Sequence, residues 1–307
     1  MRKLAVLLVL SGLFLFKSEA FAFGPGFGIS FGGDGTTVSG YGIMNGSNSQ
    51  GTLPLVSKKI SSRQDNIAYY QLADGLFAVV VKNKNKTYSL EPFVSEGLEK
   101  NADVYKNNNA ILSVNAGYFD PKNKQTISYV VKDGELIANP EENENLTSNE
   151  KLQPFLDKIY ERSEFRVLQK GRKIKYDIAK HGDKVEEGWC IKHSIQGGPQ
   201  LVPEFTAIDE YFLAIENGKV TRDAISVLHK APRTVFGFKG DDLYIIIATT
   251  KYPMTLLQMN ALCQKLGLEK AINFDGGGST SFDSQKLHIV SDKNEQARKL
   301  KSFWLLK

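Results

Sequence analysis

The chain has 307 residues, of which 41% are hydrophobic and 24% charged, and its formal net charge is +5. This is enough for one large domain or two small ones with a buried core, and the charged fraction is ordinary for a globular protein. The basic residues are scattered, and no aromatic side chains interleave with their densest cluster, residues 82–86. Bases would need such side chains for stacking, so we expect no nucleic-acid partner.

The first 22 residues have the pattern of a secretory signal peptide. Arg2 and Lys3 precede an apolar stretch that is too short to span a bilayer, and the stretch ends near Ala20-Phe21-Ala22, a small-x-small cleavage pattern. We expect cleavage near Ala22, a secreted or periplasmic mature protein, and no stable membrane insertion.

Residues 23–59 differ in composition from everything that follows. Ten of the 27 glycines lie between Gly24 and Gly51, with Ser, Asn and Thr among them. Such a segment buries too little apolar surface to fold alone, so we predict a flexible leader. Gly24-x-Gly26-x-Gly28 has no predicted strand before it and no predicted helix after it, which argues against a dinucleotide site.

From about residue 60 the pattern becomes that of a globular domain, which we predict over residues 60–307. Helical spacing predicts one helix over 95–105 with Ser95 as N-cap, and another over 254–266 that ends at Gly267. Apolar or alternating runs predict strands at residues 76–81, 87–93, 110–114, 128–137, 165–168, 173–176, 197–202, 233–238, 243–248, 270–272, 287–290 and 301–306. Many strands and few helices predict an α+β fold, a sheet-rich single domain with mixed or antiparallel strands.

Two further features of this domain are a turn signal and an acidic insertion. Asp133-Gly134 predicts a tight hairpin turn inside the 128–137 run. Residues 140–163 are acidic, and we interpret them as an insertion with a loop followed by a short helix near 150–160. The cysteines, Cys190 and Cys263, fit either one disulfide in an exported protein or two free thiols.

Residues 273–280, Asn-Phe-Asp-Gly-Gly-Gly-Ser-Thr, carry the strongest functional signal. A short apolar strand delivers Asp275, and glycines follow that can adopt positive φ and expose backbone N–H groups. The residues after the carboxylate are Gly276, Gly277, Gly278, Ser279 and Thr280. Such a cradle can bind an anion or a sugar, and the alternative interpretation is a tight turn.

Four segments together resemble a known family. They are residues 114–120 (Val-Asn-Ala-Gly-Tyr-Phe-Asp), 197–201 (Gly-Gly-Pro-Gln-Leu), 232–237 (Pro-Arg-Thr-Val-Phe-Gly) and 273–280. In this order they resemble the Asn-Gly-Gly-Phe-Phe, Gly-Pro-x-Leu, Arg-Thr-Ala-x-Gly and Asn-Leu-Asp-Gly-Gly-Gly-Ser blocks of the phosphodiester glycosidase family. The resemblance spans roughly residues 65–307. It implies a hydrolase that cleaves the glycosyl–phosphate bond of a sugar phosphodiester in envelope or extracellular glycans.

Two positions depart from the family pattern. Ala116 replaces a glycine, and Tyr118 replaces a phenylalanine and adds a hydroxyl where the substrate is expected. These departures favour a rival interpretation, a non-catalytic carbohydrate-binding protein of the cell envelope. A third interpretation is an exopolysaccharide-processing enzyme that acts on a diester of another sugar.

The chemistry of three residues fits a sugar phosphodiester. Arg233 offers a planar fork for two phosphate oxygens, or else is the buried partner of an acid. Asp275 can bind sugar hydroxyls, act as a base or stabilise an oxocarbenium-like charge, or else it caps a turn. Asn115 can hydrogen-bond a hydroxyl or the phosphate, or else it closes a turn.

The remaining candidates complete the predicted site. His229, four residues before Arg233, is a candidate acid or phosphate contact, and the other histidines lack zinc-ligand spacing. We expect no cofactor and leave a metal requirement and the oligomeric state open. A phosphomonoester leaves readily, so a pair of catalytic carboxylates is not required. Predicted substrate contacts are Gly117, Tyr118, Gly198, Thr234, Gly276, Gly277, Gly278, Ser279 and Thr280.

Overall fold

The computed structural model describes residues 21–23, 27–32, 35–40, 58–60, 66–83, 87–291 and 297–307. The chain divides into two compact units, residues 1–48 with 215–220 and residues 49–214 with 221–307. The predicted signal peptide lies almost wholly outside the described residues. In the predicted leader and just before it, the described backbone forms one sheet of β1 (Phe21–Phe23), β2 (Phe27–Gly32) and β3 (Gly35–Gly40). Every candidate site residue belongs to the second unit.

The largest sheet of the second unit has seven strands in the order β14-β19-β17-β18-β6-β5-β4. All its strand pairs are antiparallel. The strands are β4 (Lys58–Ile60), β5 (Ile67–Ala73), β6 (Leu76–Lys82), β14 (Gln200–Val202), β17 (Arg233–Lys239), β18 (Asp242–Ala248) and β19 (Lys270–Asn273). The strands predicted from apolar runs are confirmed here, and β5 is a strand that the sequence pattern did not predict.

A second sheet has the order β21-β20-β8-β22-β7. Its strands are β7 (Leu90–Lys100), β8 (Leu112–Asn115), β20 (Ser281–Ser284), β21 (His288–Val290) and β22 (Lys299–Leu306), and the helix α1 (Asn101–Asn107) packs against it. The helix predicted over 95–105 is wrong at its start. β7 continues to Lys100 because β22 pairs with it, with Lys100 opposite Lys299, and Lys301 Nζ donates to the carbonyl of Ser95 at 2.7 Å.

The third sheet has the order β10-β9-β13-β11-β12. Its strands are β9 (Val130–Lys132), β10 (Glu135–Ala138), β11 (Ser163–Lys170), β12 (Lys173–Lys180) and β13 (Cys190–Gln196). The predicted hairpin at Asp133-Gly134 is confirmed, and both turn residues have positive φ, 52° and 84°. The acidic segment holds η1 (Pro140–Glu142), α2 (Glu144–Thr147), η2 (Gln153–Phe155) and α3 (Leu156–Tyr160), which confirms the short helix.

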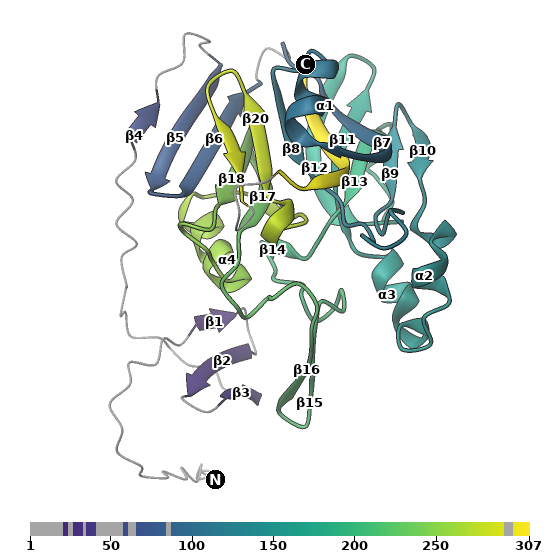
Figure 1. Cartoon of the computed structure of the whole chain (residues 1–307), viewed down its shortest axis with the longest axis vertical. Coiled ribbons are helices and arrows are strands. Elements are labelled where there is room, and N and C mark those ends of the chain that lie inside the picture. The colour runs from purple at the N-terminus through teal and green to yellow at the C-terminus, as the bar shows by residue number, and fades with distance from the viewer. Residues whose placement is uncertain are drawn as a thin grey trace. The chain divides into compact units, whose positions relative to one another are not determined.

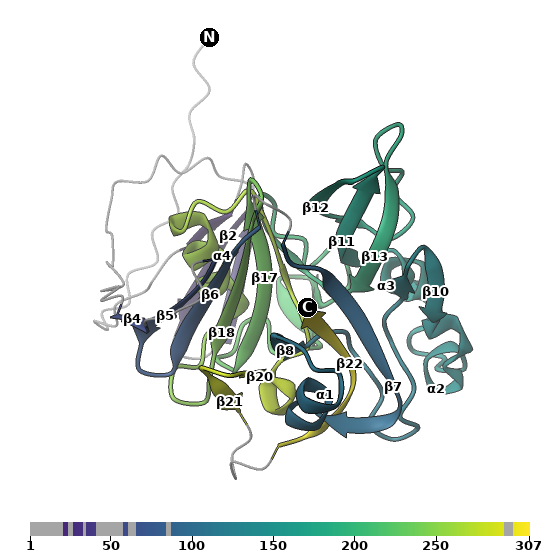
Figure 2. The same cartoon turned by 90° about the horizontal axis from the view of Figure 1, so that it is seen from above.

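The three sheets surround one core, as Figures 1 and 2 show from two directions. Aromatic side chains from all three sheets meet in this core, among them Phe236 from β17, Trp304 from β22 and Phe165 from β11. The ring of Phe165 lies 5.5 Å from that of Phe236 and 5.8 Å from that of Trp304, and all three are fully buried. Burial of rings of this size is among the largest stabilising contributions that single side chains make.

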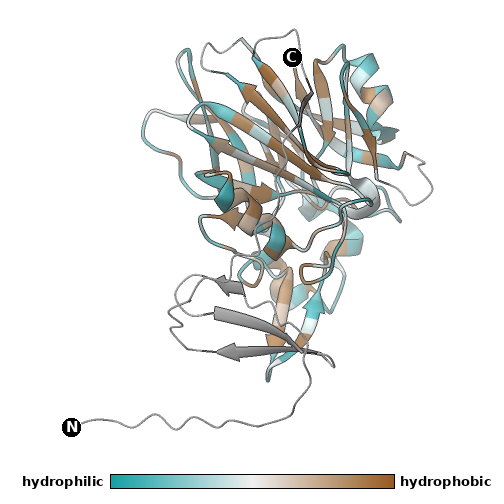
Figure 3. Ribbon diagram, turned by 90° about the vertical axis from the view of Figure 1, so that its left-hand side faces the viewer, coloured by the Kyte–Doolittle hydropathy of each residue, from teal (hydrophilic) through white to brown (hydrophobic). Residues whose placement is uncertain are grey.

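Helix α4 (Leu256–Lys265) packs against β14 and β19. Thr255 and Gln258 form a capping box at its start, so the predicted helix over 254–266 is confirmed. A further hairpin joins β15 (Leu213–Glu216) to β16 (Lys219–Asp223). Figure 3 shows apolar residues along the strands of the sheets and hydrophilic residues in many of the loops.

The described part of the chain is a sheet-rich α+β fold with few helices, as predicted. None of the helices in that part is long and apolar enough to cross a membrane. Cys190 is exposed on β13 and Cys263 is buried in α4, and both are free thiols, so the disulfide is not formed.

Candidate active site around Asp275

Asp275 follows β19 by two residues, and its backbone is fastened on both sides. The N–H of Phe274 donates to the carbonyl of Thr234 at 2.8 Å, and the N–H of Asp275 donates to the carbonyl of Ala116 at 3.0 Å. The apolar strand lies between β14 and β17, so it cannot shift without breaking two ladders. The carboxylate therefore leaves the sheet at a fixed place.

Asn115 ties three strands to this place from the end of β8. Its Nδ2 donates to the carbonyl of Asp275 at 2.6 Å. Its Oδ1 accepts from Thr234 Oγ1 at 2.8 Å and from the N–H of Ser281 at 3.0 Å. Both lone pairs of the amide oxygen are thus engaged, and Asn115 is 1% exposed. In this arrangement Asn115 and Thr234 position the Asp275 loop, and their direct contact with a substrate stays a prediction.

The glycines after Asp275 form a tight turn that includes η3 (Gly277–Ser279). A Cβ on Gly276 would lie 2.7 Å from the carbonyl oxygen of Pro232. Gly277 has φ +60°, and its N–H donates to that same carbonyl at 2.9 Å. The N–H of Gly277 is therefore used within the protein. A Cβ on Gly278 would lie 3.9 Å from the side chain of Arg298.

The hydroxyl residues after the glycines are buried beneath the turn. The N–H groups of Ser279 and Thr280 donate to the carbonyls of Gly276 and Gly277 at 3.1 and 3.2 Å. Thr280 Oγ1 is enclosed and has no hydrogen-bond partner among the residues that the structure describes. The Asp-Gly-Gly-Gly-Ser-Thr segment is therefore both a tight turn and the support of one carboxylate.

The pKa of Asp275 is raised to about 6, and burial is the largest cause. A hydrogen bond from Ser279, the charge of Arg298 and the N–H of Gly276 act in the opposite direction. Arg298 is exposed, and its Nη1 donates to Ser279 Oγ at 3.3 Å. Sequence reasoning missed Arg298 because it lies in a polar segment, outside the four blocks and without a motif of its own.

Tyr118 links three of the four blocks. Its hydroxyl donates to the carbonyl of Gly198 at 2.8 Å and accepts from Asn273 Nδ2 at 2.9 Å. Burial first, and then the negative charge of Asp275, raise the pKa of Tyr118. The hydroxyl that sets this chain apart from the family pattern is thus held by the protein itself.

At two of the glycines predicted to contact substrate, neighbouring protein atoms lie too close for a larger residue. A Cβ on Gly117 would lie 2.7 Å from the Cβ of Ser128, whose Oγ accepts from the N–H of Tyr118 at 2.8 Å. Gly198 has φ +101°, and a Cβ there would lie 2.1 Å from Glu210 Oε2. Both glycines let other groups come near Tyr118, and their contact with a substrate stays a prediction.

Arg233 donates to four backbone carbonyls and is 2% exposed. Its Nε donates to Met254 at 2.9 Å, Nη1 to Ile225 at 2.9 Å, and Nη2 to Ser226 at 2.5 Å and His229 at 2.9 Å. Burial lowers its pKa to about 10. The guanidinium here fastens residues 225–229 to the start of α4, and it presents no open fork to an anion.

His229 lies apart from these contacts. Its ring is 77% exposed, and its Nδ1 lies 3.0 Å from Asp223 Oδ2. The only hydrogen bond that joins it to a residue of the four blocks in the described structure is made through its backbone carbonyl, which accepts from Arg233. Hydrogen bonds therefore join Asn115, Tyr118, Gly198, Thr234 and Asp275, whereas His229 is not among them. The described residues contain no group of three or more His, Cys, Asp or Glu that could hold a metal ion.

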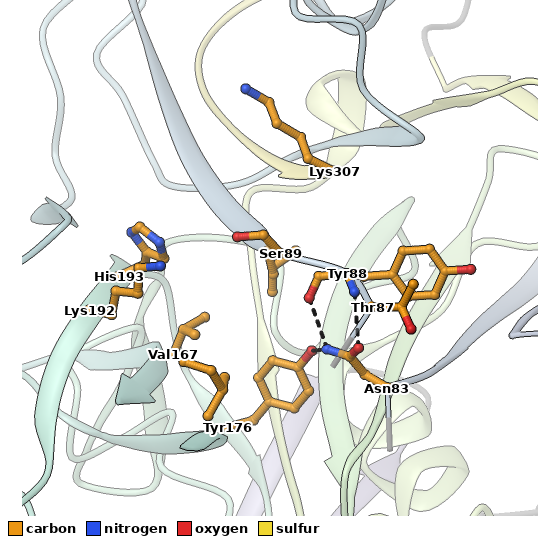
Figure 4. Close-up of a pocket in the computed structure, with 11 residues that line it drawn as sticks. Asn83, Thr87, Tyr88, Ser89, Val167, Tyr176, Lys192, His193 and Lys307 are labelled. Atoms are coloured by element: carbon orange, nitrogen blue, oxygen red, sulfur yellow. Dashed lines mark hydrogen bonds between the residues drawn. The ribbon is translucent and has the colours of Figure 1, made fainter. Parts of the chain in front are cut away.

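A pocket of the described chain lies elsewhere (Figure 4). It has a volume of about 260 Å³ and is lined by Asn83, Tyr88, Tyr176, His193 and Lys307 among others. Asn83 Nδ2 donates to the hydroxyl of Tyr176 at 3.2 Å, and burial lowers the pKa of His193 to about 4. No residue of the four sequence blocks lines this pocket, so it is not the predicted site.

The profile of the phosphodiester glycosidase family matches residues 108–307. This range includes all four blocks and every residue of the site described above. The chain belongs to the phosphodiester glycosidase family. The comparison with curated proteins found no match.

Solved structures share the fold of this phosphodiester glycosidase family member. The catalytic domain of zebrafish N-acetylglucosamine-1-phosphodiester alpha-N-acetylglucosaminidase, auto-inhibited by its pro-peptide, is 15% identical with a TM-score of 0.54, over 81% of this chain and 80% of that one. A hypothetical protein from Synechocystis is 11% identical with a TM-score of 0.54, over 95% of this chain and 64% of that one. A Burkholderia pseudomallei protein described as exported is 11% identical with a TM-score of 0.53, over 78% of this chain and 74% of that one.

Proposed function

We propose that the protein is a hydrolase that cleaves the glycosyl–phosphate bond of a sugar phosphodiester, with Asp275 as the group that acts on the sugar. The observation that carries this proposal is the placement of Asp275. Its carboxyl group leaves a buried strand at a turn held from three sides, and its pKa of about 6 lies near neutrality. A group with such a pKa is largely ionised at pH 7 and can still exchange a proton there.

Cleavage of a glycosyl–phosphate bond can proceed with a single carboxylate beside the sugar. The bond between the anomeric carbon and the phosphate oxygen breaks, and its electron pair leaves with the phosphomonoester. Positive charge develops on the sugar, where an ionised Asp275 stabilises it, and the oxygen of water bonds to the anomeric carbon while its proton passes to a base. The departing phosphomonoester is stable as an anion, so it needs no strong acid beside it.

The predicted export fits a substrate outside the cytoplasm. The basic and apolar pattern of residues 1–22 supports a secreted or periplasmic location, and one protein of similar fold is described as exported. We therefore propose envelope or extracellular glycans that carry a sugar phosphodiester as the substrate class.

The test is hydrolysis of a panel of sugar 1-phosphodiesters, including N-acetylglucosamine 1-phospho-sugars and other hexose diesters, with release of both products measured. Asp275→Asn should lower kcat by about a thousandfold or more, because the charge at the anomeric carbon is lost. Asp241→Asn, on an exposed turn, is the matched control. Full activity of Asp275→Asn would remove Asp275 from the chemistry.

The same panel separates the rival interpretations. Activity on a diester of another sugar alone would identify an exopolysaccharide-processing enzyme. If the folded protein released neither product from any diester and yet bound glycans on an array, the hydrolase proposal would be wrong, and a carbohydrate-binding role would replace it.

A further inference from the structure

We propose that Arg162 and Arg222 form an anion subsite beside Phe212 and Tyr118, and that this subsite holds the phosphate of the substrate. The identity of the ligand rests on the proposed function. The subsite itself rests on the geometry of the two guanidinium groups. Neither residue belongs to a sequence block of the family, and Arg162 lies within the segment that the sequence predicted as an acidic insertion.

Arg162 is a buried cation whose two terminal guanidinium nitrogens make no hydrogen bond to the described residues. It is 5% exposed, its Nε donates to the carbonyl of Glu210 at 3.1 Å, and its Cζ lies 3.8 Å from the centre of the Phe212 ring. Neither terminal nitrogen meets a hydrogen-bond acceptor among the described residues. Neither is among the fully enclosed polar atoms that lack a partner, so both keep some contact with solvent.

The other two buried arginines provide the contrast. Arg166 donates to the carboxylate of Glu164 and to the carbonyls of Lys180 and Asp183. Arg233 donates to four carbonyls. A buried guanidinium without partners is costly, and the free edge of a planar fork matches two oxygens of a phosphate. Arg162 alone among these three keeps that edge open.

Arg222, on β16, makes the same two kinds of contact with the neighbouring residue Tyr211. Its Nε donates to the carbonyl of Tyr211 at 2.8 Å, and its Cζ lies 4.5 Å from the centre of the Tyr211 ring. The ring of Tyr211 is in turn stacked on Phe155, with centroids 3.7 Å apart. Stacking and the Nε bonds hold both guanidinium planes in place, so less freedom is lost when an anion binds.

The acid nearest to Arg162 is already occupied. The carboxylate of Glu210 accepts from Ser163 Oγ at 2.7 Å, from the N–H groups of Ser163 and Gln200 at 3.2 and 3.1 Å, and from Thr206 Oγ1. Burial lowers the pKa of Arg162 to about 10; Tyr118 and the charge of Glu210 act in the opposite direction, and the charge of Arg222 lowers the pKa further. An anion bound beside the two arginines would reduce their mutual repulsion.

The subsite adjoins Asp275 through Tyr118. The rings of Phe212 and Tyr118 lie 5.6 Å apart, and the Tyr118 hydroxyl accepts from Asn273, two residues before Asp275. The positive charge of Arg162 and the negative charge of Asp275 both act on Tyr118. The bond to be cleaved joins a sugar to a phosphate, so the groups that act on these two parts have to be neighbours.

The test uses inorganic phosphate and glycerol 3-phosphate as probes, with binding measured by calorimetry on the whole protein. Asp275→Asn should bind both probes at least as tightly as the unchanged protein does, because a negative charge beside the subsite is removed. Arg222→Met and Arg162→Lys should each weaken binding at least about tenfold, because hydrogen bonds to a charged group are lost. Arg172→Met, an exposed arginine on the turn between β11 and β12, should change nothing.

The kinetic arm measures KM and kcat on the diester panel. Loss of the subsite should raise KM about tenfold or more in Arg222→Met. If Arg162→Lys does not fold, as its thermal unfolding would show, Arg222→Met decides alone. Phosphate binding that depends on the arginines without any hydrolysis would keep the subsite and refute the proposed function. Hydrolysis with unchanged KM and unchanged phosphate binding in the folded variants would overturn the subsite and leave the proposed function standing.

Discussion

The side-chain amide of Asn115 donates to the backbone carbonyl of Asp275 at 2.6 Å, across 160 residues of sequence. The same side chain accepts from Thr234 and Ser281, so one amide holds the ends of three strands in register around the carboxylate. The Asn-Ala-Gly block and the Asp-Gly-Gly-Gly block therefore form one hydrogen-bonded structural unit. This relationship gives the first prediction.

Asn115→Asp should lower kcat by about 10- to 100-fold, because a carboxylate cannot donate to the Asp275 carbonyl and Asp275, the group that we propose acts on the sugar, loses its position. Its charge also repels Asp275. Asn108→Ala is the control, since it removes a side-chain hydrogen bond to the carbonyl of Val104 at 3.0 Å at the C-terminal end of α1, outside the four blocks in sequence. An unchanged kcat in Asn115→Asp would show that the loop does not need this bond.

Asp275→Asn should stabilise the protein at pH 7 by on the order of 1–2 kcal/mol, because the ionised form is disfavoured by burial. Its pKa rises from 3.8 to about 6 on folding, so below pH 3.8 both states carry the proton and the gain vanishes. Between these values the unfolded state loses its proton first, and the cost of keeping Asp275 grows with pH. Urea unfolding of the two proteins at pH 3.5 and pH 7 measures this, and a gain that is equal at both values contradicts it.

Arg298→Gln should move the acidic limb of the pH–rate profile to higher pH. The positive charge of Arg298 holds the pKa of Asp275 below the value that burial alone would give. Without it Asp275 takes up its proton more readily, and kcat/KM declines at a higher pH than the value of about 6 expected for the unchanged protein. Arg172→Gln is the matched control, and coincident profiles for all three proteins would mean that Arg298 does not act on Asp275.

Tyr118→Phe should cost about 1 kcal/mol of stability and leave the order of preferred sugars unchanged. The hydroxyl is engaged with Gly198 and Asn273, so its removal breaks two internal hydrogen bonds and no bond to a sugar. The measurement is the free energy of unfolding together with kcat/KM over the diester panel. A changed order of sugars would restore the hydroxyl as a specificity contact.

Arg233→Lys should cost about 2–4 kcal/mol in the free energy of unfolding with little change in KM for the folded fraction. An ammonium group cannot reach four carbonyls that a planar guanidinium bonds at once, and some are left buried without a donor. A stable Arg233→Lys protein with a strongly raised KM would instead support the phosphate contact predicted from the sequence.

The sequence predicted those strands and turns whose conformation depends on residues close together in the chain. Apolar β-branched runs became β6, β17 and β18, and Asp133-Gly134 became a turn with two positive φ angles. Helical spacing misled at Ser95, because the pairing of β7 with β22 depends on residues far along the chain. Local spacing carries no information about that partner.

In the candidate site, too, the sequence motifs were predictable, whereas contacts between residues far apart in the chain were not. The four blocks identified the family. In the structure, hydrogen bonds of Asn115 join it to Asp275 and Thr234, and the roles of these residues toward a substrate stay predictions. The blocks did not reveal that the donors of Arg233 are used by carbonyls, since that depends on where residues 225–229 and 254 lie. Arg162, Arg222 and Arg298 stand outside any motif, and only the folded arrangement brings them beside Phe212, Tyr211 and Ser279.

The order of strands around β8 has a consequence for how the protein is made. β8, which carries Asn115, lies between β20 and β22, and both partners come from the last part of the chain. An emerging polypeptide therefore holds β8 without a neighbour on either side until β20 and β22 have been synthesised, more than 160 residues later. Contacts so distant in sequence form slowly, and an unpaired apolar strand is exposed to aggregation meanwhile. A ribosome-bound or truncated chain that ends before β20 should have no working centre, and a chaperone that shields β8 would favour its correct assembly.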